Sequence, residues 1–177
     1  MIEASKIRNW EIVGAIFSIL AGSLLHFVFE WSGNSEIVAL FAAVNESTWE
    51  HLKLAFWPTF IFALIEWLIW GRKTKNFCQA VAVKLVSMPF LIIILFYGWL
   101  LFFEDSFIWD ISIFIISVII GYILSYRILN TKRNIGYQRL FILMIVIILF
   151  AMSFLTYFPP KNLLFEDPVN GGYGIEE

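Results

Sequence analysis

The sequence has few of the side chains from which most metal and redox sites are built. Its 177 residues include one cysteine, Cys78, and two histidines, His26 and His51. A single thiol excludes an intramolecular disulfide and a thiolate metal cluster. The chain also lacks the glycine-rich patterns of nucleotide-binding loops, the GxSxG of serine hydrolases and the HExxH of metalloproteases. Nucleotide-binding, flavin-binding and metalloprotease-type functions therefore have no support from these motifs.

Charge is also scarce, because only 15% of the residues are charged and 60% are hydrophobic. The mean hydropathy is +0.83, whereas a soluble domain is roughly half apolar and a quarter charged. The net charge of −2 gives no reason to expect a nucleic-acid partner. This composition is typical of a protein that lies in a bilayer.

Five stretches are close in length to the roughly 20 apolar residues that cross a hydrocarbon core. We therefore predict an all-α, polytopic membrane helix bundle of about five transmembrane helices over residues 1–157. The predicted spans are Trp10–Trp31, Ser47–Trp70, Phe77–Phe103, Phe107–Leu129 and Tyr137–Tyr157.

Lysine and arginine are distributed unevenly between the two sides of the predicted bundle. One side carries Lys6, Arg8, Arg72, Lys73, Lys75, Arg127, Lys132, Arg133 and Arg139. The other side carries only Lys53 and Lys161. Because basic connections stay in the cytoplasm, we predict a cytoplasmic N-terminus and an extracytoplasmic C-terminus.

Two segments outside the spans differ from free loops. Residues 35–44 are apolar enough to predict a short interfacial helix, and Ser47 with Glu50 matches a capping box at the start of the second span. In residues 158–177, prolines and glycines exclude a helix, but large apolar residues are unusual in a disordered segment. We expect an ordered, non-helical tail that folds over the extracytoplasmic face.

The first span contains a stripe in which small and ionisable residues recur every fourth position. On a helix, this spacing places them along one face, where small residues allow a neighbouring helix to approach closely. The stripe consists of Gly14, Ser18, Gly22, His26 and Glu30. We expect it to face the bundle.

The two histidines and the nearby glutamates form the main candidate site. The end of the first span carries His26 and Glu30, and the start of the second carries Glu46, Glu50 and His51, so antiparallel packing would bring them together. Imidazole and carboxylate suit Zn, Fe or Mn, and a glutamate left outside the coordination sphere can act as general base. We assign metal binding to His26, His51 and Glu50, with Glu46 as the alternative ligand. Catalysis is assigned to Glu30 or Glu46.

A purely structural use of the same residues is the main alternative. Glu50 would then cap the second span, and Lys53 would pair with Glu46 or Glu50. His26 would form a hydrogen bond to a carboxylate.

Three other ionisable residues carry separate predictions. Asp167, in the tail, is a candidate extra ligand or lid residue. Glu66 and Lys84 enter the membrane at comparable depth on neighbouring spans, which predicts a buried structural pair; a proton relay is the alternative.

Several motifs resemble those of an uncharacterised family of small multi-span membrane proteins from Firmicute bacteria. They are HF-x-FE-x-SG at 26–33, VNES-x-WEHLKL-x-F-x-P at 44–58, LF-x-DP at 164–168 and GYGI at 172–175. The resemblance implies an integral membrane protein of the bacterial cell membrane and implies no activity.

From the sequence we favour a metal-dependent hydrolase or transferase that acts on a lipid or lipid-linked substrate. Trp31, Trp49 and Trp57 would line an apolar entry for acyl chains. One alternative is a protein that binds or transports a cation or small solute. Another is a non-enzymatic assembly subunit, whose small-residue stripe docks a membrane protein partner.

Overall fold

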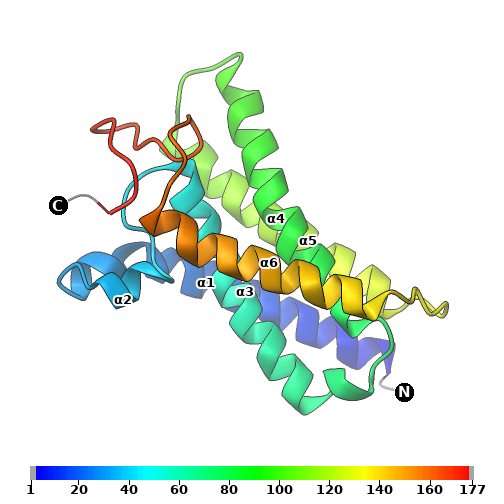
Figure 1. Cartoon of the computed structure of the whole chain (residues 1–177). Helices are drawn as coiled ribbons and strands as arrows, with labels where there is room; N and C mark the ends of the chain where they lie inside the picture. Colours follow the sequence, from blue (N-terminus) through cyan, green and yellow to red (C-terminus); the bar gives the residue numbers. More distant parts are fainter. Residues whose placement is uncertain (1–2, 176–177) are drawn as a thin grey trace.

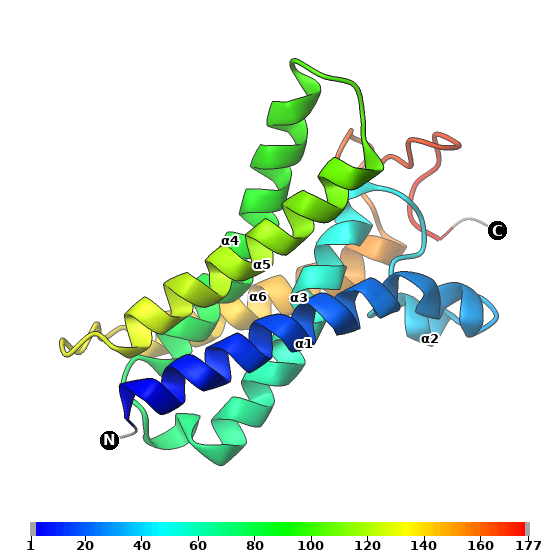
Figure 2. The ribbon, with the colours of Figure 1, turned by 180° about the vertical axis from the view of Figure 1, so that it is seen from behind.

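The structure is a computed structural model that describes residues 3–175 as a bundle of helices (Figures 1 and 2). Within that range there is no strand, only an isolated bridge between Glu166 and Tyr173. Residues 1 and 2 of the predicted bundle and residues 176 and 177 of the predicted tail lie outside the described residues. The elements are α1 (Ala4–Trp31), α2 (Glu36–Ala39), α3 (Thr48–Ile69), a 3₁₀ turn η1 (Gly71–Lys73), α4 (Phe77–Leu100), α5 (Phe107–Leu129) and α6 (Gln138–Tyr157). The prediction of an all-α bundle is confirmed.

Five of the helices, α1, α3, α4, α5 and α6, are long and apolar enough to cross a membrane. Four of them begin within one residue of the predicted position. The exception is α1, which begins at Ala4 rather than at Trp10. Its first turns include Lys6 and Arg8, which are good helix formers, so the helix extends beyond the apolar run.

The outside of the bundle is apolar. In the most apolar window of α3, 61% of the residues are buried inside the bundle, whereas only 11% are buried in that of α6. The side chains that α6 leaves exposed include Leu140, Leu143, Ile147 and Phe150. Such a continuous apolar surface is rare on a soluble monomer, so the surroundings of this bundle have to be apolar.

The small-residue stripe of α1 faces the interior, against α3 and α5. A Cβ atom added at Gly14 would lie 2.6 Å from the rings of Phe62 and Tyr122. Ser18 is buried and lies 2.9 Å from the Tyr122 hydroxyl. A Cβ atom at Gly22 would meet the backbone carbonyl of Leu54. The small residues of the stripe are therefore packed against the chain's own helices and do not form a free docking surface.

The interfacial helix is shorter than predicted. Instead of residues 35–44, only Glu36–Ala39 are helical, which is about one turn. The carbonyl of Ala39 accepts a hydrogen bond from Lys53 Nζ at 2.8 Å. Because a buried ammonium from α3 bonds at this point, the chain turns toward α3 after a single helical turn.

The predicted capping box is only half formed. Ser47 Oγ accepts from the backbone N–H of Glu50 at 3.4 Å, as expected of an N-cap. The carboxylate of Glu50 instead accepts from the N–H of Val44 at 3.1 Å, and the N–H of Ser47 donates to Asn45 Oδ1 at 2.9 Å.

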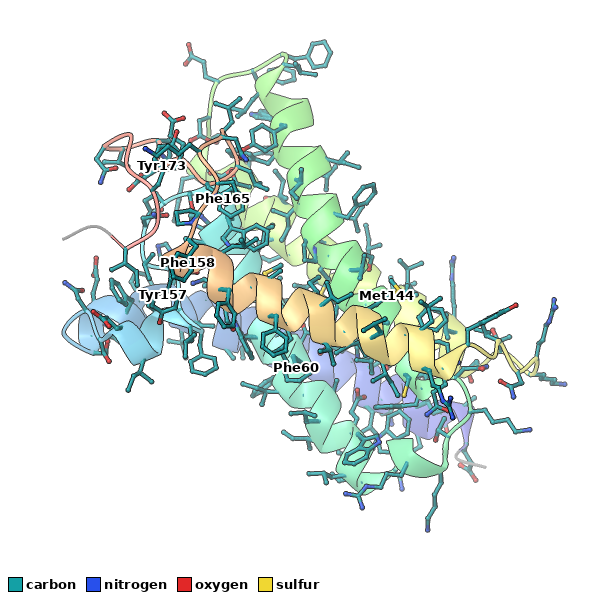
Figure 3. All side chains as sticks on the ribbon, in the orientation of Figure 1. Phe60, Met144, Tyr157, Phe158, Phe165 and Tyr173 are labelled. Atoms are coloured by element: carbon teal, nitrogen blue, oxygen red, sulfur yellow. The ribbon has the colours of Figure 1, made fainter. Side chains whose placement is uncertain are left out.

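The C-terminal tail packs on the end of the bundle where α1 ends and α3 begins, here called the tail face. Figure 3 shows Phe165 and Tyr173 above Tyr157, the last residue of α6. The Phe165 ring stacks on Trp49 with centroids 4.7 Å apart, and the N–H of Trp49 donates to Leu164 O at 2.8 Å. The tail therefore covers the start of α3.

The contact between α1 and α3 gives a direct test of this packing. Gly22→Ala should lower the free energy of unfolding by about 1–3 kcal/mol, because the new methyl group meets backbone. Gly98→Ala on α4 is the matched control, since nothing lies within 4 Å of its added Cβ and it shares the gain in helix propensity. Thermal unfolding in detergent measures both variants. Equal shifts for the two would contradict the close contact.

Candidate metal centre

His26 and His51 come together at the tail face because α1 and α3 pack side by side. His26 lies near the end of α1 and His51 lies in the first turn of α3. Their rings stack with centroids 5.3 Å apart and an angle of 29° between the planes. The predicted meeting of the two histidines is therefore present in the structure.

Glu46 supplies the carboxylate of this site. It lies in the connection just before the N-cap Ser47. Its Oε1 is 3.7 Å from His26 Nε2 and its Oε2 is 3.5 Å from His51 Nε2. Within the described residues, His26, Glu46 and His51 form a group whose candidate ligand atoms all lie within 4.8 Å of one another. Tetrahedral ligand atoms at about 2 Å from zinc are roughly 3.3 Å apart. Modest movements of these half-exposed side chains would bring the three ligand atoms to that spacing.

The ring of His51 is oriented by a backbone carbonyl. Its Nδ1 lies 2.9 Å from the carbonyl oxygen of Ser47. A carbonyl can only accept, so Nδ1 carries the hydrogen and Nε2 of the neutral ring presents a lone pair to Glu46. Histidine ligands of metals are commonly held by such a bond on the other nitrogen.

The lone pair of a neutral His51 and the carboxylate of Glu46 therefore face each other across 3.5 Å. Two acceptors in this position repel unless a cation lies between them or on the ring. A proton on Nε2 would make an ion pair, and a divalent metal would make a coordination site. His26 has a different setting, because its buried Nδ1 has no hydrogen-bond partner within residues 3–175 and its ring packs edge-on against Phe27.

A small pocket opens beside these ligands. It has a volume of about 110 Å³ and is lined by His26, Phe27, Phe29, Glu30, Ala43, Val44, Asn45 and Glu46. A water molecule takes about 30 Å³ in the liquid, so the pocket has room for a few waters or a small polar group. Glu30, one turn beyond His26, is exposed at this pocket.

Glu50 does not join the histidines. It is 1% exposed, and its Oε2 lies 2.5 Å from Lys53 Nζ. Its Oε1 accepts from Thr156 Oγ1 of α6 at 2.8 Å. Successive helical residues point about 100° apart, so Glu50 faces the interior while His51 faces the pocket. Assigning Glu50 as a ligand does not fit this geometry. The carboxylate beside the two histidines is that of Glu46, the alternative ligand.

Asp167 organises the tail rather than the pocket. It is buried, and its Oδ1 accepts from the N–H of Val169 at 2.9 Å. Its backbone N–H donates to Gly172 O at 2.9 Å. The group of three candidate ligands does not include Asp167. The tail is nevertheless tied to the edge of the pocket, because Asn45 Nδ2 donates to Gly174 O at 2.9 Å.

Glu66 and Lys84 form the expected buried pair, with 3.2 Å between Lys84 Nζ and Glu66 Oε2. A third member, Glu11 of α1, was not predicted from the sequence; its Oε2 lies 3.6 Å from Lys84 Nζ. Glu11 lies three residues before Gly14 and continues the α1 stripe toward the other end of the helix. This helical spacing could have predicted that Glu11 faces the interior of the bundle.

The apolar helices and buried charged groups define a multi-pass α-helical membrane protein. A family of unknown function, DUF6512, matches residues 1–175, so the chain belongs to that family. No curated protein and no solved structure matches the chain.

The Glu50–Lys53 pair has a testable energetic consequence. Lys53→Met leaves a buried carboxylate without its cation and should lower the free energy of unfolding by about 3–5 kcal/mol. The double variant Lys53→Met with Glu50→Gln removes both charges and should recover a large part of the loss. The free energies of unfolding of the single and the double variant are compared in detergent. A double variant that is no more stable than Lys53→Met would argue against a charge-pair origin.

Proposed function

We propose that this protein is a metal-dependent membrane hydrolase or transferase, with His26, His51 and Glu46 as ligands of Zn, Fe or Mn. The observation that carries the proposal is the opposition of His51 Nε2 and the Glu46 carboxylate across 3.5 Å, beside a second imidazole. A divalent cation would remove the repulsion and bind all three side chains.

The ligand types favour a catalytic rather than a purely structural ion. Structural zinc sites use four protein ligands, whereas two histidines and a glutamate are a set found in zinc hydrolases, where a further position holds water. The bound metal would activate that water as a nucleophile and polarise the substrate oxygen. Glu30 lines the same pocket and would accept the proton of the water at its carboxylate.

The position of the site supports a substrate that reaches it from the bilayer. The pocket holds only a small polar group, so the bulk of a substrate would lie outside it. Phe27 and Trp31 stack with centroids 5.8 Å apart, and both are exposed beside the site. Trp49 and Trp57 are buried and do not line an entry. A lipid or lipid-linked molecule would place its head group in the pocket and its chains along the exposed aromatic residues.

The proposal extends to location and partners. The basic residues favour a cytoplasmic N-terminus in a bacterial cell membrane, which puts the tail face and the pocket outside the cell. Membrane lipids are the expected surroundings, and a lipid-linked molecule is the expected partner.

Elemental analysis of protein purified without chelator or histidine tag tests the metal. The wild type should hold about one ion per chain, and His26→Ala, His51→Ala and Glu46→Gln should each lose most of it. Occupancy should also fall as the pH falls, because a protonated imidazole cannot bind a metal.

Two controls separate this outcome from a general loss of structure. Glu36→Gln changes an exposed carboxylate on the tail face. The double variant Lys53→Met with Glu50→Gln removes the neighbouring buried ion pair. Both should keep the metal. A wild-type protein that binds no Zn, Fe or Mn at neutral pH would overturn the proposal. The histidines and Glu46 would then form an ion pair without a metal.

A further inference from the structure

Lys84 lies at the centre of a buried charged cluster far from the tail face. It is completely buried on α4, seven residues after the start of the helix, which is about 10 Å along the axis. Its Nζ is 3.2 Å from Glu66 Oε2 on α3 and 3.6 Å from Glu11 Oε2 on α1. It also lies 4.2 Å from the ring centroid of Tyr122 on α5. Four transmembrane helices therefore meet at one ammonium group.

The ionisable groups of this cluster come from four helices. They are Glu11, Glu66, Lys84 and Tyr122, from α1, α3, α4 and α5 in that order. A phenol is neutral at neutral pH. Two carboxylates and one ammonium would then leave one uncompensated negative charge.

That charge would be costly at this place. Glu66 is 0% exposed and Glu11 is 4% exposed. A buried charge without a counter-charge costs several kcal/mol, and the cost is not reduced by lipid outside the bundle. The cluster therefore needs one more positive charge.

Two oxygens mark where that charge can bind. Glu66 Oε1 and Glu11 Oε2 are buried and accept no hydrogen bond within residues 3–175, although Glu11 Oε2 lies within ion-pair distance of Lys84. The other oxygens are engaged, because Glu66 Oε2 accepts from Lys84 and Glu11 Oε1 accepts from Ser125 Oγ at 3.0 Å. Fully buried carboxylate oxygens that accept no hydrogen bond are rare in folded proteins.

We propose that this cluster is a proton-binding site inside the membrane, in which Glu11 and Glu66 together hold one exchangeable proton beside Lys84. The proton forms an O–H bond at Glu11 Oε2, the carboxylate farther from the ammonium, and is taken from water. Glu66 stays ionised as the direct partner of Lys84, so the loaded cluster is neutral. Ser125 then donates to the carbonyl oxygen of the protonated Glu11.

Hydroxyl groups continue from the cluster toward the tail face. The Tyr122 hydroxyl lies 2.9 Å from Ser18 Oγ, which accepts from Thr59 Oγ1 at 3.1 Å. Hydroxyls both donate and accept, so this buried chain can reorient when the charge of the cluster changes. The proton site is independent of the proposed metal centre and shares no residue with it.

Infrared spectroscopy of the full chain in an ester-free detergent tests the proposal. A protonated carboxyl has a carbonyl stretch that a carboxylate lacks, and deuteration shifts it. At neutral pH, Glu11→Gln should lose the band of one carboxyl per chain. Glu66→Gln should lose the same band, because Glu11 becomes the only carboxylate facing Lys84 and ionises. Glu104→Gln, an exposed position in the α4–α5 connection, should leave the band unchanged.

Stability measurements complete the test. Each single glutamine variant keeps one carboxylate for Lys84 and should stay folded, whereas the Glu11→Gln, Glu66→Gln double variant should unfold at a clearly lower temperature. A band that neither single variant removes would overturn the proposal. A band that appears only when sodium and potassium are replaced by bulky organic cations would also overturn it, since a metal ion would then occupy the site. Single variants as unstable as the double would show that Lys84 needs both carboxylates ionised, which contradicts a shared proton.

Discussion

The close antiparallel packing of α1 on α3 is the contact on which the rest of the molecule depends. It is possible because Gly14, Ser18 and Gly22 leave no bulk on the facing side of α1. One helix pair then sets two polar centres at once, since His26 meets His51 at one end and Glu11 approaches Glu66 through Lys84 at the other. In a bilayer, helices gain little from burying apolar surface against each other, so close approach and polar contacts decide which faces meet.

The spans could be predicted because apolar length is the strongest signal a membrane sequence carries. Every predicted span has its helix, and α5 has the predicted bounds. Two features near the start of α3 do not follow from the residue spacing. Glu46 precedes the N-cap of α3, so helical spacing does not set its direction, and Glu50 is drawn inward by Lys53. The carbonyl of Ala39 bonds to that same lysine, which the local pattern of residues 35–44 did not reveal.

The two polar centres obey different constraints. The proposed metal centre is half exposed, so its groups can change partner or hydration at modest cost. The Lys84 cluster is buried, so every charge in it has to be matched by another. The sequence located Glu66 and Lys84 because charged residues are conspicuous in apolar spans. It did not show how many charges meet there, because that number depends on which face of α1 packs inward.

The short spacing between Glu50 and Lys53 bears on how the chain enters the bilayer during synthesis. The two residues are one turn apart on the same helix, so α3 can insert with these two charges already compensated. Lys84 has no such neighbour, because its carboxylates lie on α1 and α3. When α4 leaves the ribosome, those two helices have already been made. The order of the helices along the chain thus provides the counter-charges before the buried lysine needs them.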